Sequence, residues 1–144
     1  NAQYAACAAV KPGNSSKDTV AAAIFELTKG LLELGILTGE LETLITELAC
    51  KKYFIHGLGH WLGLDVHDVG AYKVTDIERP FEPGMVLTIE PGLYIPSGSD
   101  CDPRWWGMAV RIEDDLLVIK DGHLNLTDTA PKEIADIEAL MASR

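Results

Sequence analysis

The chain is poor in cationic side chains and has no long apolar run. Twelve Lys and Arg residues stand against 22 Asp and Glu residues, which gives a formal net charge of −10 at pH 7. Nucleic-acid binding relies on clustered Lys and Arg that neutralise phosphates, so this charge argues against a nucleic-acid partner. No apolar segment reaches the roughly 20 residues needed to cross a bilayer, and no signal peptide opens the sequence. We therefore expect neither a nucleic-acid nor a membrane partner.

Cysteine is also scarce. Cys7, Cys50 and Cys101 are an odd number, are widely spaced and form no CxxC pair. This usage indicates a reducing cytoplasm rather than a disulfide framework or a zinc ribbon. Residues 1–2 lack an initiator methionine and are interpreted as the remnant of a cleaved tag, in which case residues 3–144 are an excised piece of a longer protein.

Local signals in the first third of the chain predict helices. Residues 3–10 are rich in alanine and are typical of the end of a helix. A second helix is expected to start at Asp18 or a neighbouring serine and to continue to Gly35, because apolar residues then recur at helical spacing. Residues 41–48 carry the same periodicity and predict a third helix.

After Cys50 the pattern changes to short β-type runs separated by glycine and proline. A last helix is expected with Pro131 at its first position and an apolar stripe that ends at Met141. The predicted strands cover residues 53–55, 66–69, 85–94, 108–119 and 124–126. At 144 residues and without a linker, the chain is predicted to be one α+β domain with a mostly antiparallel sheet.

Three of the four histidines lie in one glycine-rich segment, residues 56–70. His56 and His60 have the i, i+4 spacing of a helical metal pair, but the intervening glycines make a helix unfavourable. On an extended strand, residues four apart face the same side, so this pair can still converge. A lone histidine is more often structural, yet three histidines in one segment point to a functional site.

Two glutamates follow on strand-like runs. Strand alternation places Glu90 on the same face as Thr88, and Glu113 on the same face as Arg111. Both faces lie beside otherwise apolar residues, where a carboxylate is costly unless it is paired or bound to metal. Histidine and carboxylate are ligands of hydrolytic divalent metals. The alternative is a solvent-facing strand with ordinary surface acids.

Three motifs carry a resemblance to a known family. They are HGLGHWLGLDVHDVG (56–70), EPGMVLTIEPGLYIP (82–96) and GMAVRIEDDLLV (107–118). Over residues 4–141 they resemble the C-terminal half of the pita-bread metallopeptidases, which include methionine aminopeptidase, prolidase, creatinase and aminopeptidase P. The tryptophan after His60 most resembles bacterial aminopeptidase P, the Xaa-Pro aminopeptidase. The resemblance implies the C-terminal part of a catalytic domain, with a curved antiparallel sheet and helices on one face.

The resemblance implies metal ligands for a dinuclear site. His60 matches the histidine ligand of one metal, Glu90 matches a carboxylate on that same metal, and Glu113 matches the carboxylate that bridges both. Glu90 could also take the proton of the attacking water. The implied ions are two Mn²⁺, which suit an oxygen-rich site.

Four further residues match positions around those ligands. His56 and His67 match two non-ligand histidines that contact the substrate and help to stabilise the tetrahedral intermediate. Tyr94 and Arg111 match positions that hydrogen-bond around the water and the bridging glutamate. The implied substrates are peptides with proline at the second position.

The chain departs from the family in one respect. The family's site needs two further aspartates on upstream strands, and Asp18, the only aspartate before His60, lies at a helix start. Three of five ligands remain, so we expect this chain alone to bind metal weakly or not at all and to be inactive or nearly so.

We also expect this chain to self-associate. Alternatives are a prolidase, or a pita-bread domain reused as a binding module; creatinase, which works without metal, is disfavoured by His60, Glu90 and Glu113.

Overall fold

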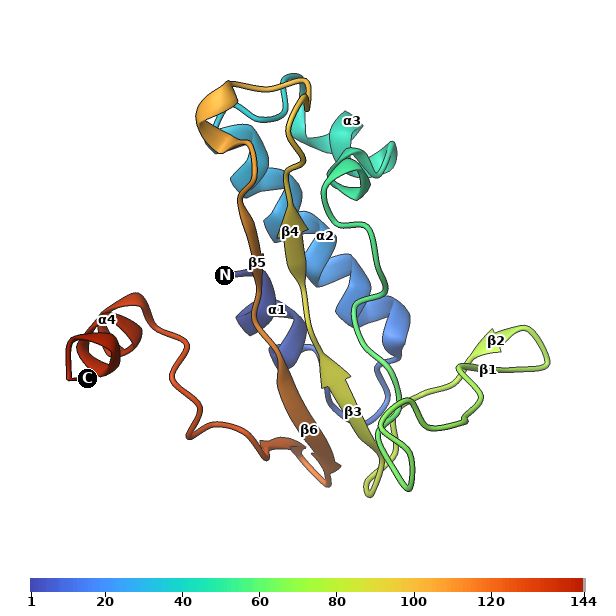
Figure 1. The fold of residues 1–144 in the computed structure, drawn as a ribbon. Helices are drawn as coiled ribbons and strands as arrows, with labels where there is room; N and C mark the ends of the chain where they lie inside the picture. The colour runs from blue at the N-terminus through green and yellow to red at the C-terminus, as the bar shows by residue number, and fades with distance from the viewer. Residues whose placement is uncertain (144) are drawn as a thin grey trace.

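The computed structural model describes residues 1–143 (Figure 1). Two helices cover one face of a set of short antiparallel strands, and a fourth helix lies apart from this body. The elements in chain order are α1 (Ala2–Ala8), α2 (Ser16–Glu33), α3 (Leu41–Thr46), a 3-10 turn (Ala49–Lys52), β1 (Lys73–Val74), β2 (Ile77–Glu78), β3 (Val86–Ile89), β4 (Gly92–Tyr94), a second 3-10 turn (Pro103–Trp105), β5 (Ala109–Arg111), β6 (Asp114–Ile119), β7 (Gly122–Asn125) and α4 (Ile134–Ala142). The α+β class and the antiparallel pairing are as predicted.

The long helix α2 begins at a capping box. Ser15 is the N-cap, and its backbone N–H and hydroxyl both donate to the Asp18 carboxylate, at 2.7 and 2.8 Å. These hydrogen bonds lower the pKa of Asp18. Leu27 and Leu31 then face the strands, where they join a core with residues of α1, β3 and β6. The helices therefore occupy one side of the sheet and leave the other side free.

The two long strands predicted over residues 85–94 and 108–119 pair with each other, and both are interrupted at the same level. Ile89 pairs with Asp114 at the end of the β3–β6 ladder, and Gly92 pairs with Arg111 at the start of the β4–β5 ladder. The register is the same on both sides of the break, so Glu90 lies opposite Glu113. Pro91 lacks an N–H group and cannot continue the ladder. The single strands predicted over residues 85–94 and 108–119 are therefore each divided in two.

The histidine segment runs along the free edge of β3. Thr88 N–H donates to the His60 carbonyl at 2.9 Å, Glu90 N–H donates to the Leu58 carbonyl at 2.7 Å, and Trp61 forms a bridge with Leu87. This approach depends on Gly59, because a Cβ there would lie 1.9 Å from the Thr88 carbonyl oxygen. The extended conformation predicted for His56–His60 is thus explained by pairing to β3.

Three local predictions were wrong, and one hairpin was missed. Residues 53–55 and 66–69 are not strands, and the exposed Val66 and Val69 show that the second run has no sheet face to cover it. The β1–β2 hairpin was not predicted. The last helix begins at Ile134 with Glu133 as its N-cap, so Pro131 lies upstream of the first turn.

None of the helices within residues 1–143 is both long enough and apolar enough to cross a membrane.

Candidate metal centre

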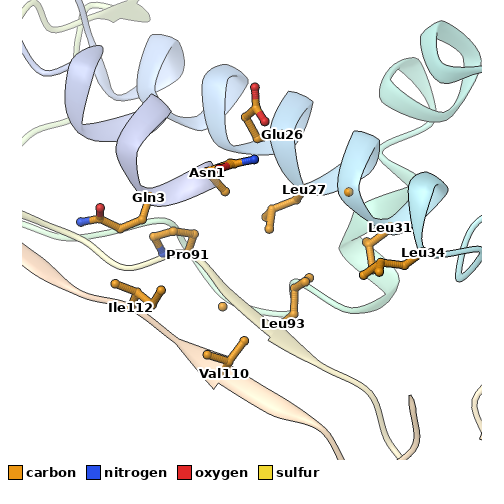
Figure 2. Close-up of a pocket in the computed structure, with 13 residues that line it drawn as sticks. Asn1, Gln3, Glu26, Leu27, Leu31, Leu34, Pro91, Leu93, Val110 and Ile112 are labelled. Atoms are coloured by element: carbon orange, nitrogen blue, oxygen red, sulfur yellow. The ribbon is translucent and has the colours of Figure 1, made fainter. Parts of the chain in front are cut away.

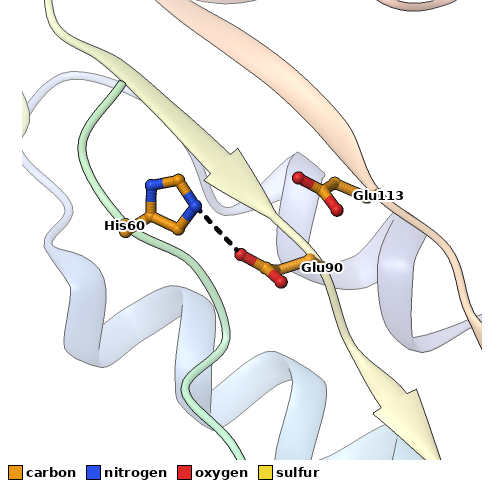
Figure 3. A group of neighbouring side chains, drawn as sticks. All are labelled: His60, Glu90 and Glu113. Atoms are coloured by element: carbon orange, nitrogen blue, oxygen red, sulfur yellow. Dashed lines mark ion pairs between the residues drawn. The ribbon is translucent and has the colours of Figure 1, made fainter. Parts of the chain in front are cut away.

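His60, Glu90 and Glu113 converge on the face of the strands away from the helices (Figure 3). Each offers one ligand atom, and the three atoms lie within 4.8 Å of one another. His60 comes from the segment paired to β3, while the two glutamates come from the facing breaks in the strand ladders. Leu87 and Ile89 point into the core with the helices, so Glu90, one residue on, points to the opposite face.

The His60 ring is held with one nitrogen free for a ligand. Its Nδ1 lies 2.9 Å from the Trp61 carbonyl oxygen, which can only accept, so Nδ1 carries the proton. Nε2 then presents a lone pair toward Glu90 Oε1, 3.4 Å away. This is the arrangement of metal-binding histidines, in which the second ring nitrogen is fixed by a carbonyl or carboxylate.

Glu90 is a buried carboxylate held from two sides. The residue is 8% exposed, and its Oε1 accepts from the Thr88 hydroxyl at 3.0 Å. Its Oε2 lies 3.4 Å from a guanidinium nitrogen of Arg111. The prediction that Thr88 and Glu90 share a face agrees with this contact.

Glu113 differs from the expectation of a buried strand position, because the residue is exposed and lies in the break between β5 and β6. Desolvation of its carboxyl group, followed by the negative charges of Glu90 and Asp115, raises the pKa of Glu113. Two facing carboxylates, with the lone pair of an imidazole nitrogen close by, form a donor set that fits a divalent cation. The residues present therefore fit part of a metal site.

His56, Tyr94 and Arg111 form a hydrogen-bonded chain beside this centre. Arg111 Nε donates to the Tyr94 oxygen at 2.8 Å, and that hydroxyl donates to His56 Nε2 at 3.1 Å. His56 Nδ1 donates to the Gly57 carbonyl at 2.6 Å, which fixes the tautomer that accepts from tyrosine. A Cβ at Gly92 would lie 2.9 Å from both His56 Nε2 and the Tyr94 oxygen, so the glycine makes room for the pair.

His67 reaches the centre from the loop before β1. The residue is exposed, and its ring centre lies 4.4 Å from that of His60 in an edge-on arrangement. All seven residues predicted for the site are therefore brought together. Thr88 and Gly92 were not among them. Thr88 had a detectable signal, since it lies two residues before Glu90, but the role of Gly92 depends on a contact between distant segments.

A separate hollow lies on the helix side of the strands (Figure 2). It has a volume of about 400 Å³ between α2 and strands β4 and β5, where Leu27, Leu31, Leu93 and Val110 face one another. Glu26 is the one acidic residue among those that line it. This hollow is apolar and carries no cluster of ligand groups, so it is not the candidate centre.

Comparison with known proteins agrees with this geometry. The sequence profile of metallopeptidase family M24 matches residues 1–120. The chain is 51% identical over 140 residues to a Xaa-Pro aminopeptidase of Haemophilus influenzae, covering 97% of this chain and 32% of that protein. It is 45% identical over 133 residues to a Xaa-Pro aminopeptidase of Escherichia coli, covering 92% of this chain and 30% of that protein.

Solved structures show the same likeness. Proline aminopeptidase P II from Yersinia pestis matches with a TM-score of 0.94 at 47% identity, over 99% of this chain and 33% of the other. Aminopeptidase PepP from Pseudomonas aeruginosa matches with a TM-score of 0.96 at 44% identity, over 99% of this chain and 32% of the other. The fold is therefore that of part of a pita-bread domain, and the chain spans about a third of the length of the relatives it matches.

Proposed function

Because the chain belongs to metallopeptidase family M24, we propose that residues 3–144 are the C-terminal part of the catalytic domain of a cytoplasmic Xaa-Pro aminopeptidase. The reaction is hydrolysis of the bond between an N-terminal residue and a following proline. The observation that carries the proposal is the convergence of His60, Glu90 and Glu113 within 4.8 Å. The similarity to proteins named Xaa-Pro aminopeptidase, at up to 51% identity, supports the substrate class.

Membership in a metallopeptidase family implies divalent metal ions. We propose that the ions are two Mn²⁺, because two of the three donors are carboxylates. His60 and Glu90 would hold one ion, and Glu113 would be a ligand of both. When bound, the ions lower the pKa of a water molecule and polarise the scissile carbonyl. The remaining ligands would come from residues outside this chain.

The protein groups around the ions have different roles in the proposed reaction. Glu90 takes the proton of the attacking water, since it is held next to His60 while Thr88 and Arg111 fix its two oxygens. We propose that His67, which is exposed and whose ring lies beside that of His60, donates to the substrate carbonyl oxygen as negative charge develops there.

In the hydrogen-bonded chain beside the metal centre, Arg111 orients the Tyr94 hydroxyl toward His56. That chain fixes the His56 ring beside the centre, where its Nε2 accepts a hydrogen bond from a donor group of the substrate in place of Tyr94 and so orients the substrate. These three residues therefore orient the substrate, while His67 stabilises the developing negative charge and Glu90 takes the proton of the water.

Activity is expected to require residues beyond this chain. The full-length polypeptide with Mn²⁺ should release the first residue from Xaa-Pro peptides and leave matched Xaa-Ala peptides uncut, while the 144-residue chain should be more than about tenfold slower, because a site with too few ligands loses metal affinity. The rate of release of the N-terminal amino acid measures both. Equal rates on the two peptides would remove the proposed specificity, and turnover by the 144-residue chain within tenfold of the full-length rate would show that its own ligands suffice.

We also propose that the 144-residue chain self-associates through its apolar helix-side surface. Leu34 and Val110 line the hollow of Figure 2 and are 45% and 58% exposed. Both also line a neighbouring apolar hollow together with Met108, which is 51% exposed. A contiguous apolar surface of this kind is costly in water, and a second copy is the partner always present. Sedimentation equilibrium at tens of micromolar should show a dimer or larger species, and Val110→Lys should shift it toward monomer. A wild-type chain that stays monomeric would contradict this proposal.

A further inference from the structure

Thr88 connects the two segments that carry His60 and Glu90. The residue is 2% exposed and lies on β3 directly opposite His60, whose carbonyl oxygen accepts from Thr88 N–H at 2.9 Å. Its side chain points to the same side as the Glu90 carboxylate, two residues further along the chain. A buried hydroxyl in this place is costly unless both of its hydrogen-bonding functions are used.

Both functions of the hydroxyl are used, and each is directed at one of the two segments. Thr88 Oγ1 accepts from the backbone N–H of His60 at 3.0 Å, and it donates to Glu90 Oε1 at 3.0 Å. The N–H group can only donate, so the hydroxyl proton is directed at the carboxylate. Glu90 Oε1 is the same oxygen that lies 3.4 Å from His60 Nε2.

We propose that Thr88 is a positioning residue of the metal centre, which holds the His60 imidazole and the Glu90 carboxylate in fixed relation through its single hydroxyl group. This inference rests on the proposed function, because it assigns Thr88 to the metal site named there. Thr88 does not touch the substrate or the ions. It acts by fixing which oxygen of Glu90 faces His60 and by anchoring the backbone from which the His60 ring extends.

Two features of the surroundings suit this role. The β-branched side chain of threonine restricts χ1, so the hydroxyl is held toward both partners. Gly59 lets the histidine segment approach closely, since a Cβ there would lie 1.9 Å from the Thr88 carbonyl oxygen and 3.2 Å from Thr88 Oγ1. The Arg111 guanidinium also contacts Glu90, but it lies near Oε2 and comes from a side chain that is 45% exposed. Within residues 1–143, Thr88 is therefore the buried donor to Oε1.

The experiment uses the full-length polypeptide with Co²⁺ as the probe metal. Thr88→Val keeps the shape of the side chain and removes the hydroxyl, while Thr88→Ser keeps the hydroxyl and removes the methyl group. The matched control is Thr28→Val on α2, because Thr28 is fully buried and its hydroxyl has no hydrogen-bond partner within residues 1–143. The readouts are the Co²⁺ dissociation constant, the visible absorption bands of bound Co²⁺, and kcat and KM at saturating metal.

We expect Thr88→Val to weaken Co²⁺ binding by about 10- to 100-fold, the usual cost of losing a partner that orients metal ligands, and to change the absorption bands. At saturating metal, kcat should fall more than KM changes. Thr88→Ser should recover most of the affinity and the wild-type bands, and Thr28→Val should behave as wild type. Should Thr88→Val fail to fold, Thr88→Ala removes the same hydroxyl without overpacking, and its comparison with Thr88→Ser decides.

Unchanged Co²⁺ affinity and bands in a folded Thr88→Val or Thr88→Ala protein would overturn this inference and leave the proposed function intact. Failure of Thr88→Ser to recover affinity would overturn it as well, since packing of the methyl group rather than the hydroxyl would then be responsible. A wild-type polypeptide that binds no Co²⁺ would overturn the proposed function together with the inference.

Discussion

Glu113→Ala in the full-length polypeptide is expected to abolish hydrolysis of Xaa-Pro peptides. In the proposed assignment Glu113 is shared by two ions, so its removal would weaken the whole centre rather than one ligand position. Lewis-acid stabilisation by a metal contributes several kcal/mol, which corresponds to a loss of on the order of 10³-fold or more in kcat. Metal content by elemental analysis should fall together with the rate of release of the N-terminal residue.

The structure supports a large effect because the surroundings of Glu113 disfavour its negative charge when no cation is bound. Desolvation of its carboxyl group and the facing charge of Glu90 raise its pKa. In the variant, Arg111 and Thr88 would be left to compensate Glu90 alone, through contacts of 3.4 and 3.0 Å. The protein should therefore stay folded while the site loses its affinity for metal.

His67→Ala is the matched comparison within the same site. Its ring lies 4.4 Å from the His60 ring, but it is exposed and outside the three-residue ligand group. Removing it should lower kcat by about 10²-fold, as for other donors to developing negative charge, and leave metal content near wild type. Loss of metal in His67→Ala, or retention of metal and activity in Glu113→Ala, would show that the roles are assigned wrongly.

The sequence patterns predicted the α+β class and the residues of the candidate site, because both depend on local or near-local signals. Strand alternation alone placed Thr88 and Glu90 on one face, and their hydrogen bond agrees. Glycine spacing indicated that His56 and His60 lie on extended backbone. The roles assigned to His56, His67, Tyr94 and Arg111 stay predictions, although the structure brings these residues to the centre.

What the sequence could not reveal depends on pairing between distant segments. The position of Glu90 opposite Glu113 follows from the register of β3 with β6 and of β4 with β5, and no local pattern specifies a register. Val66 and Val69 are β-branched residues typical of strands, but among the residues that the structure describes they pair with no strand, so tertiary context decided their conformation. The break after Glu90 did have a local signal in Pro91, which was overlooked.

A buried ion pair next to Glu113 attaches the C-terminal segment to the strands. Asp114 is 1% exposed, and both of its oxygens accept from Lys132 Nζ, at 2.7 and 2.6 Å. The Thr127 hydroxyl donates to the same carboxylate at 2.8 Å, and the Gln3 amide donates from α1. One carboxylate therefore joins α1, β6 and the segment before α4.

Lys132→Met is expected to lower the free energy of unfolding by about 3 kcal/mol. The substitution keeps much of the apolar length of the side chain but leaves Asp114 buried without its cation, and breaking a buried pair costs about 3–5 kcal/mol. We take the lower end because the Lys132 side chain is 16% exposed and because Thr127 and Gln3 remain. Urea unfolding at pH 7, followed by circular dichroism, measures the difference.

The matched control is Lys29→Met, which removes an exposed ion pair with Glu33 at 3.9 Å and should cost about 0–1 kcal/mol.

The dependence of stability on pH is a second test of the pair between Lys132 and Asp114. Burial alone would raise the pKa of Asp114, but the hydrogen bonds from Lys132 and Thr127 outweigh it and hold that pKa below its ordinary value. The stabilisation is thus complete above the unfolded pKa of about 4 and is lost as the pH falls through the lower folded value. The stability gap between wild type and Lys132→Met should therefore narrow below about pH 4, whereas a gap that stays constant down to pH 2 would mean that Lys132 acts through packing and not through its charge.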